Sequence, residues 1–199
     1  MALISNGTTI FDNGSMASGF GADLKFISKA TASASSSISF TSGIDSTYKE
    51  YVFYFVNMHP QNDNVKFGVN FSTDGGSNYN TTKTTTTFTA IHNEGDTQAL
   101  ITYNTAEDLA QQTTDQFLHP NLGNGNDECS SGFLHLFNPA STTYVKHFIA
   151  TYQGYSSDDY SQIYYTAGYN NTTSAINAVK FECSAGTIES GEILLFGIN

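Results

Sequence analysis

The most regular pattern of hydrophobic and polar positions lies in residues 50–80. Residues 51–56 are six consecutive apolar or aromatic side chains. A run so short and so rich in Tyr, Phe and Val predicts a strand that is covered on both faces, rather than a helix. Residues 65–72 then alternate strictly between apolar and polar or small side chains. That alternation predicts a second strand with one face in the core and the other in water.

Turn-forming residues punctuate these two strands. Residues 57–64 contain one Pro, one Asp and several Asn, which all favour a turn. The second strand stops at Asp74-Gly75-Gly76, because glycine supplies the positive φ that a tight turn requires. We therefore expect residues 51–56 and 65–72 to pair as a β-hairpin whose aromatic face packs on a second sheet.

The rest of the chain supplies more short strands. Threonine prefers strands, so the threonine run at 81–87 predicts a sheet edge or an exposed strand. Residues 92–130 are expected to be mostly irregular, with one helical turn at 106–112, and to carry a functional surface. Further strands are expected at 24–28, 35–41, 132–137, 144–152, 162–167, 175–183 and 192–198.

Eight to ten short strands without a long helix predict an all-β fold. Their spacing and their Gly, Asn and Asp turns favour an antiparallel β-sandwich of jelly-roll-like form. A length of 199 residues fits a single sandwich domain at 23–199 that follows a short N-terminal arm at 1–22. The arm is poor in large apolar residues and is expected to lie over something else.

The net charge of the chain argues against some classes of binding partner. Seven basic residues stand against 18 acidic ones, for a net charge of -11. Nucleic acid is not expected as a partner, because neutralising phosphates needs clustered cations. An anionic membrane surface is disfavoured for the same reason. The N-terminus has neither a cationic start nor a long apolar segment, so neither a secretory signal nor a membrane span is predicted.

Motifs for chemistry are sparse. The five histidines lack the close spacing of metal ligands, and the sequence contains neither a Gly-x-Ser-x-Gly elbow nor a phosphate loop. We expect no catalytic, cofactor-binding or metal-binding residues, and hence no enzyme. Acidic pairs such as Asp127-Glu128 keep calcium binding and glycoside hydrolysis open as weaker alternatives. Without a signal peptide, Cys129 and Cys183 favour two unpaired thiols over a disulfide.

Tyrosines are concentrated between residues 152 and 169. Exposed tyrosines with polar neighbours suit sugar stacking or a protein interface. Tyr155, Asp158, Asp159 and Tyr160 are therefore candidates for a glycan or partner surface. The alternative is that these tyrosines line the interior of the sandwich and its rim.

Several phrases of the chain carry a resemblance. They are FTSGIDSTYKEYVFYFVNMHP, FSTDGGSNYN, LFNPASTTYVKHFIATY and INAVKFECSAGTIESGEILLFGIN, within residues 36–199. They resemble a family of tailed-bacteriophage virion structural proteins that is common in marine phages. In that family the chain closes on a patterned strand, whose positions here are Gly186, Ile188, Ser190, Gly191, Ile193, Leu195, Gly197 and Ile198. The resemblance implies a shared sandwich and a place in the particle, and it brings no catalytic residues.

The resemblance and the residues together predict a non-enzymatic virion protein. The first expectation is a capsid decoration (cement) protein, a homotrimer that binds the major capsid protein or other virion proteins. Ile10, Phe11 and Phe20 of the arm are its candidate anchoring residues. The alternative is a tail-fibre or head-fibre knob that binds a host cell-surface glycan. A third hypothesis, ranked below these two, is that the protein is a glycan-degrading enzyme, and the acidic loops alone support it. The expected location is the virion, assembled in the host cytoplasm.

Overall fold

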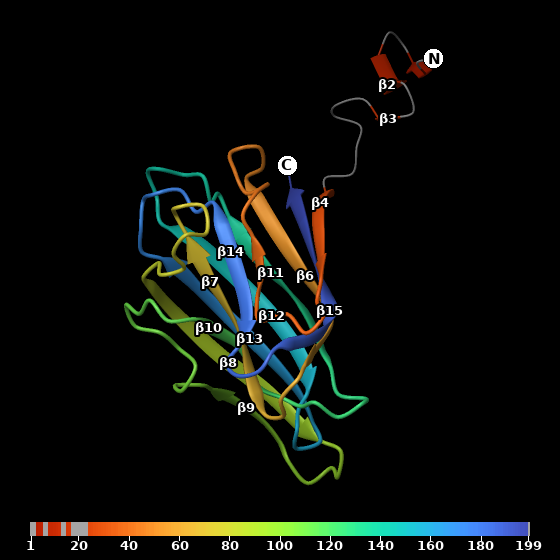
Figure 1. The fold of residues 1–199 in the computed structure, drawn as a ribbon, viewed down its shortest axis with the longest axis vertical. Coiled ribbons are helices and arrows are strands. Elements are labelled where there is room, and N and C mark those ends of the chain that lie inside the picture. Colours follow the sequence, from red (N-terminus) through yellow and green to blue (C-terminus); the bar gives the residue numbers. More distant parts are fainter. Residues whose placement is uncertain (1–2, 6–7, 13–14, 17–23, 199) are drawn as a thin grey trace.

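Strands make up the regular structure of the protein. The computed structural model describes residues 3–5, 8–12, 15–16 and 24–198, and these residues form fifteen strands and no helix (Figure 1). None of the described segments is therefore a helix of the length and apolarity that crossing a membrane requires. Three short strands near the N-terminus form a sheet of their own: β1 (Leu3–Ser5), β2 (Thr8–Asp12) and β3 (Ser15–Met16).

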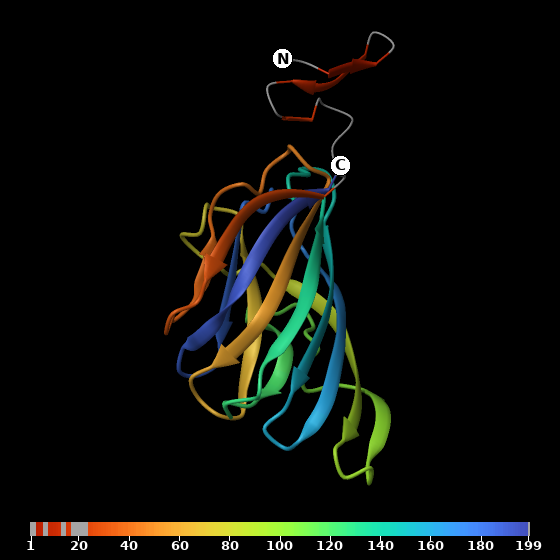
Figure 2. The ribbon, with the colours of Figure 1, turned by 90° about the vertical axis from the view of Figure 1, so that its right-hand side faces the viewer.

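The other twelve strands form two antiparallel sheets that pack face to face (Figure 2). The larger sheet contains, in spatial order, β4 (Leu24–Thr31), β15 (Ile188–Ile198), β6 (Glu50–Pro60), β11 (Ser130–Phe137), β12 (Lys146–Tyr155), β13 (Tyr160–Asn170), β8 (Lys83–Asn93) and β9 (Ala99–Tyr103). The smaller sheet contains β10 (Gln116–Leu122), β7 (Val65–Ser72), β14 (Ala178–Cys183) and β5 (Ile38–Phe40). The predicted all-β sandwich is confirmed.

The strand order is that of a jelly roll. Eight of the strands form the two four-stranded sets β4-β15-β6-β11 and β5-β14-β7-β10. The first and last of these strands, β4 and β15, lie side by side in the larger set, and β5 and β14 lie side by side in the smaller one, which is the double Greek-key arrangement. Two hairpins are inserted into this plan, β8–β9 between β7 and β10, and β12–β13 between β11 and β14. Both hairpins extend the larger sheet beyond β11.

Aromatic side chains fill the space between the sheets. The ring of Phe55, from β6, lies 5.7 Å from Phe67, 5.2 Å from Tyr152 and 5.1 Å from Phe181, measured between ring centroids. All four side chains are at most 2% exposed. Edge-to-face and tilted contacts of this kind stabilise beyond the burial of area alone. The core therefore joins β6 and β12 of the larger sheet to β7 and β14 of the smaller one.

The expected hairpin of residues 51–56 and 65–72 is wrong. β6 pairs with β11 and β15, whereas β7 pairs with β10 and β14. Both strands carry aromatic side chains on their inner faces, and these faces meet across the core. The chain turns where the sequence predicted, at 61–64, but it crosses from one sheet to the other. The prediction that β6 is covered on both faces is wrong for most of the outer face, where Val52 is buried but Tyr54 is half-buried and Val56 is 41% exposed.

The polar face of β7 is covered rather than solvated, contrary to the sequence prediction. Asn70 is 3% exposed, and its amide donates to Asp115 Oδ1 at 2.8 Å and to the Thr113 carbonyl at 3.0 Å. Lys83 Nζ, itself buried, donates to Asn70 Oδ1 at 2.7 Å. The chain between β9 and β10 folds over this face and satisfies its polar groups, as buried polar atoms require.

Three predictions about residues 81–130 are also wrong. The threonine run is neither an edge nor fully exposed, because β8 lies between β13 and β9, and Thr85 and Thr87 point inward and are buried. Residues 106–112 form turns instead of a helical turn. The stretch expected to be irregular contains β9 and β10.

Candidate functional site

The structure brings together the four residues proposed as a glycan or partner surface. Tyr155 ends β12, Tyr160 begins β13, and Asp158 and Asp159 form the turn between them. The Tyr155 hydroxyl donates to Asp159 Oδ1 at 3.1 Å, and the Tyr160 hydroxyl donates to Gln98 Oε1 at 2.7 Å. The bond to Asp159 stabilises the neutral phenol and raises the pKa of Tyr155. Both hydroxyls are satisfied within the chain, which leaves the ring faces for a ligand.

The turn between β8 and β9 lies beside this group. Glu94 N donates to the Asp159 carbonyl at 3.1 Å. A shallow hollow of about 330 Å³ opens here, lined by His92, Asn93, Glu94, Gln153, Tyr155 and Ser161. A polar hollow next to an aromatic ring is the kind of surface that holds a sugar by stacking and hydrogen bonds. We call this end of the molecule, at the β8–β9 and β12–β13 turns, the tip.

The anchoring candidates lie elsewhere in the chain. Ile10 and Phe11 belong to β2, but their side chains, and all of Phe20, are outside the described residues.

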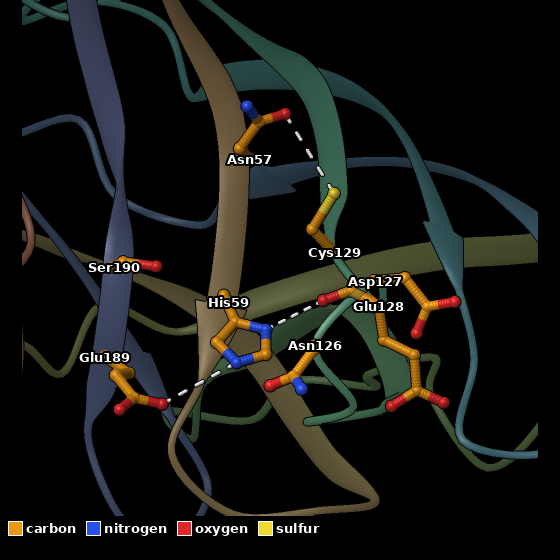
Figure 3. A pocket seen from close by; sticks show the side chains of 8 residues that line it. All are labelled: Asn57, His59, Asn126, Asp127, Glu128, Cys129, Glu189 and Ser190. Carbon is orange, nitrogen blue, oxygen red and sulfur yellow. Dashed lines mark hydrogen bonds and ion pairs between the residues drawn. The ribbon is translucent and has the colours of Figure 1, made fainter.

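A larger hollow, of about 540 Å³, lies where β6, β15 and the start of β11 meet (Figure 3). Both neighbours of β6 change register here, and Asn57 adopts a φ of 49°. Gly191 has a φ of 120°, and a Cβ on it would lie 2.7 Å from the Asn57 carbonyl oxygen. Bulges of this kind splay the strands and expose side chains that a regular ladder would cover.

The chemistry of this hollow centres on His59. Its Nδ1 lies 2.7 Å from the Glu128 carbonyl oxygen and its Nε2 lies 3.6 Å from a Glu189 carboxylate oxygen. The Cys129 thiol points instead toward Asn57 Oδ1, at 3.9 Å (Figure 3). The cysteine–histidine bond that activates a thiolate is therefore not made. Among the described residues, no group of three or more His, Cys, Asp or Glu side chains is placed to hold a metal ion.

Sequence reasoning did not find the His59 hollow. Its residues come from three distant segments, and only the bulges bring them together. The two cysteines are unpaired, as the sequence favoured. Burial raises the pKa of Cys183 to about 11, so this thiol is a poor nucleophile.

The outer face of the larger sheet carries a row of mostly apolar and aromatic side chains. The row consists of residues in direct cross-strand register and begins at Lys29 on β4: Lys29, Leu194, Tyr54, Phe133, Thr151, Tyr165, Phe88 and Tyr103. Phe88 and Tyr165 stack at 4.8 Å between ring centroids and are 45% and 38% exposed. The tyrosines of residues 152–169 thus divide, since Tyr152 and Tyr164 face the core while Tyr165 lies on the outer face.

His119, on β10, is buried beneath the inserted hairpins. Its ring lies 4.9 Å from that of Tyr164, and its Nδ1 accepts a 3.3 Å hydrogen bond from Asn121 N. Its Nε2 has no hydrogen-bond partner among the described residues. Burial disfavours the charged imidazolium and lowers the pKa of His119 to about 3.

Comparison of the chain with protein-family models, with curated proteins and with solved structures found no match. Its function is therefore inferred from its own residues and geometry.

We predict that His119 makes the fold sensitive to acid. The folded pKa is about 3 against an ordinary value of 6.5. Below pH 6.5 the unfolded chain binds a proton that the folded chain does not bind, so the free energy of unfolding falls as the pH decreases. At 1.36 kcal/mol per pH unit, the loss between pH 7 and pH 5 is about 2 kcal/mol. Urea unfolding at both pH values measures it.

The His119→Gln variant should be less stable at pH 7 but should lose less stability on acidification. His92→Gln is the matched control, because the His92 side chain is 58% exposed, and it should retain the wild-type pH dependence. An unchanged pH dependence in His119→Gln would show that this imidazole is not the titrating group.

Proposed function

We propose that this chain is a non-enzymatic structural protein of a tailed-phage virion. Its first role is that of a capsid decoration protein, a homotrimer that binds and stabilises the shell of major capsid protein. The observation that carries the proposal is the apolar outer face of a rigid jelly roll. Exposed apolar area costs about 25 cal/mol per Å² in water, and patches of this kind mark surfaces that another protein covers.

The phage-like phrases support the proposal because the fold uses them structurally. In FSTDGGSNYN, Asp74 accepts hydrogen bonds from Ser72 Oγ at 2.7 Å and Asn78 N at 2.9 Å, while Gly75 and Gly76 have φ values of 75° and 90°. The bond from Asn78 Nδ2 to Asp74 Oδ2, at 2.7 Å, and the bond from Ser72 Oγ favour the carboxylate and lower the pKa of Asp74 to about 2. The phrase is therefore a turn motif that specifies the sandwich.

The closing strand, β15, uses its pattern in the same way. Gly197 lies under the ring of Tyr48, which a Cβ would approach to 2.2 Å. Ile193 and Leu195 are fully buried in the core. The residues that carry the resemblance are thus those that close the jelly roll. This supports the proposal that the chain shares its fold with the phage virion proteins that it resembles.

Copy number in the purified particle tests the proposed role most directly. A decoration protein covers the shell, so we expect copies on the order of the major capsid protein, in the hundreds. Quantitative mass spectrometry of particles, with the major capsid protein as internal standard, measures the ratio. A few to a few dozen copies would reject shell decoration and favour a fibre or baseplate part.

The N-terminal arm is proposed as the anchor to the particle, because Ile10, Phe11 and Phe20 are among its few large apolar side chains and include its two aromatic ones. Deleting residues 1–22 should abolish binding to particles that lack the protein. Thermal unfolding should change little, since every core residue identified in the described part of the chain lies within 24–198. Binding that survives the deletion would place the anchor on the sandwich itself.

A fibre knob that binds a host glycan is the second proposal. The specific observation is the polar hollow at the tip, where the Tyr155 ring borders Glu94 and Gln153. The Tyr155 ring, whose hydroxyl is bonded to Asp159, lines this hollow and is held in place for stacking, whereas Tyr160, bonded to Gln98, does not line it.

The double variant Tyr155→Ala, Tyr160→Ala should reduce adsorption to host cells about tenfold or more, because each lost sugar stack costs ~0.5–1.5 kcal/mol. Adsorption of labelled protein to host cells measures it. Tyr144→Ala is the control, since Tyr144 is 71% exposed and lies just before the opposite end of β12. Equal adsorption by the double variant and the control would reject sugar binding at the tip.

A further inference from the structure

The inserted hairpins carry a continuous uncharged patch on their outer side. We call it the hairpin patch, and it comprises Phe88 on β8, Ile101 and Tyr103 on β9, Ile149 on β12, and Tyr165 and Ala167 on β13. Phe88 faces both Tyr165 and Tyr103 in register, and Ile149 faces Ala167. The inner side of β8 is covered by β10 and residues 104–115, and the inner sides of β12 and β13 pack on β10, whereas β9 is exposed on both sides.

The hairpin patch has a ridge and a trough side by side. The stacked rings of Phe88 and Tyr165 form the ridge. The trough runs over Ala167 and Gly168, between Ile149 on one side and Thr86 on the other, as two adjoining hollows of about 430 Å³ and 190 Å³. A surface that contains both a protrusion and a depression can be complementary to itself in a two-fold contact, and the ridge of one copy can also fit the depression of the next copy in a ring.

Charge favours a second copy as the occupant. The chain has a net charge of -11, so two copies repel each other wherever acidic surfaces meet. The hairpin patch avoids this repulsion because none of its six residues is ionic at neutral pH. The nearest carboxylate is at its rim, where the Tyr103 hydroxyl donates to Asp108 Oδ2 at 2.7 Å. A basic partner would instead be attracted to the acidic turns, because the uncharged patch has no charge to attract it.

The exposed area fits a stable contact. Five side chains of the patch are 38–77% exposed: Phe88, Ile101, Tyr103, Ile149 and Tyr165. At about 200 Å² each, they leave on the order of 500 Å² of open surface. A standard interface buries ~800 Å² per partner, of which the centre is apolar and aromatic and the rim polar. The patch supplies such a centre, and its neighbouring threonines supply such a rim.

We propose that the hairpin patch is the surface through which copies of this chain associate. The inference rests on the self-association included in the proposed function, and it names the surface responsible. The eight-strand jelly-roll order is complete without β8, β9, β12 and β13, and these insertions, besides the core residues of β12, add this outer face. Association buries the Phe88–Tyr165 ridge of one copy against the trough of another.

Sedimentation velocity of the full chain tests this proposal. At concentrations on the order of 10 µM, the wild type should sediment as an oligomer, whose mass gives the number of copies. The variants Tyr165→Glu and Ile149→Glu, each measured alone, place a carboxylate at the centre of the contact. Each should weaken association by at least about 100-fold, because a buried unpaired charge is strongly unfavourable. Both positions are open on the outer face, so thermal unfolding should confirm that the monomers remain folded.

Phe26→Glu is the matched control. Phe26 is 60% exposed on the outer face of the same sheet, but it lies on β4, at the edge opposite β9. This variant should associate like the wild type. A monomeric wild type, a Tyr165→Glu protein that still associates, or equal disruption by Phe26→Glu would each overturn the proposal. If the wild type is monomeric and Tyr165→Glu abolishes its binding to the particle, the hairpin patch binds the shell and not a second copy, which would also overturn the proposal.

These outcomes separate the proposal from the virion role. If the protein is monomeric in solution but present in hundreds of copies per particle, the self-association proposal is rejected and the shell-decoration proposal is retained. An oligomer that dissociates in Tyr165→Glu, with few copies per particle, would support the surface and reject decoration.

Discussion

The contact between aromatic rings across the two sheets is the constraint on which the rest of the structure depends. Phe55 touches Phe67, Tyr152 and Phe181, so one side chain ties together four strands of both sheets. Because the aromatic faces of β6 and β7 must meet across the core, the two strands cannot also pair edge to edge. The chain has to cross between the sheets at 61–64, and that crossing leads to the jelly-roll order.

Strand β12 contributes Tyr152 to this aromatic core, but β13 and β8 extend the larger sheet past it, so their inner face needs a different cover. The threonines of β8 and the amides of β7 and β10 supply it as a buried polar layer, in which Thr85 Oγ1 donates to Gln116 Oε1 at 2.6 Å. Desolvation within this layer lowers the pKa of Lys83 to about 8. Since the polar groups in this layer are hydrogen-bonded within the chain, the outer side and the tip are the surfaces through which we expect the hairpins to contact other molecules.

Much of the fold could be predicted from local pattern, because alternation and turn residues determine where strands begin and end. Pairing could not, since a strand with one apolar face fits a hairpin and a face-to-face packing equally well, as β6 and β7 show. The hairpin patch could not be predicted either, because Phe88, Ile149 and Tyr165 come from three strands and are brought together only by the strand register. The tip was easier to find, since Tyr155 to Tyr160 is one local turn.

The three proposed surfaces occupy different parts of the molecule. Leu24, where the described sandwich begins, pairs with Ile198 at one end, and the turns of the tip lie at the opposite end (Figures 1 and 2). The hairpin patch lies on the side between them. Under the proposed role, an arm that holds the particle directs the tip outward, while the side faces contact neighbouring copies. Attachment, association and recognition then require no shared residues, so each can be removed by substitution without disturbing the other two.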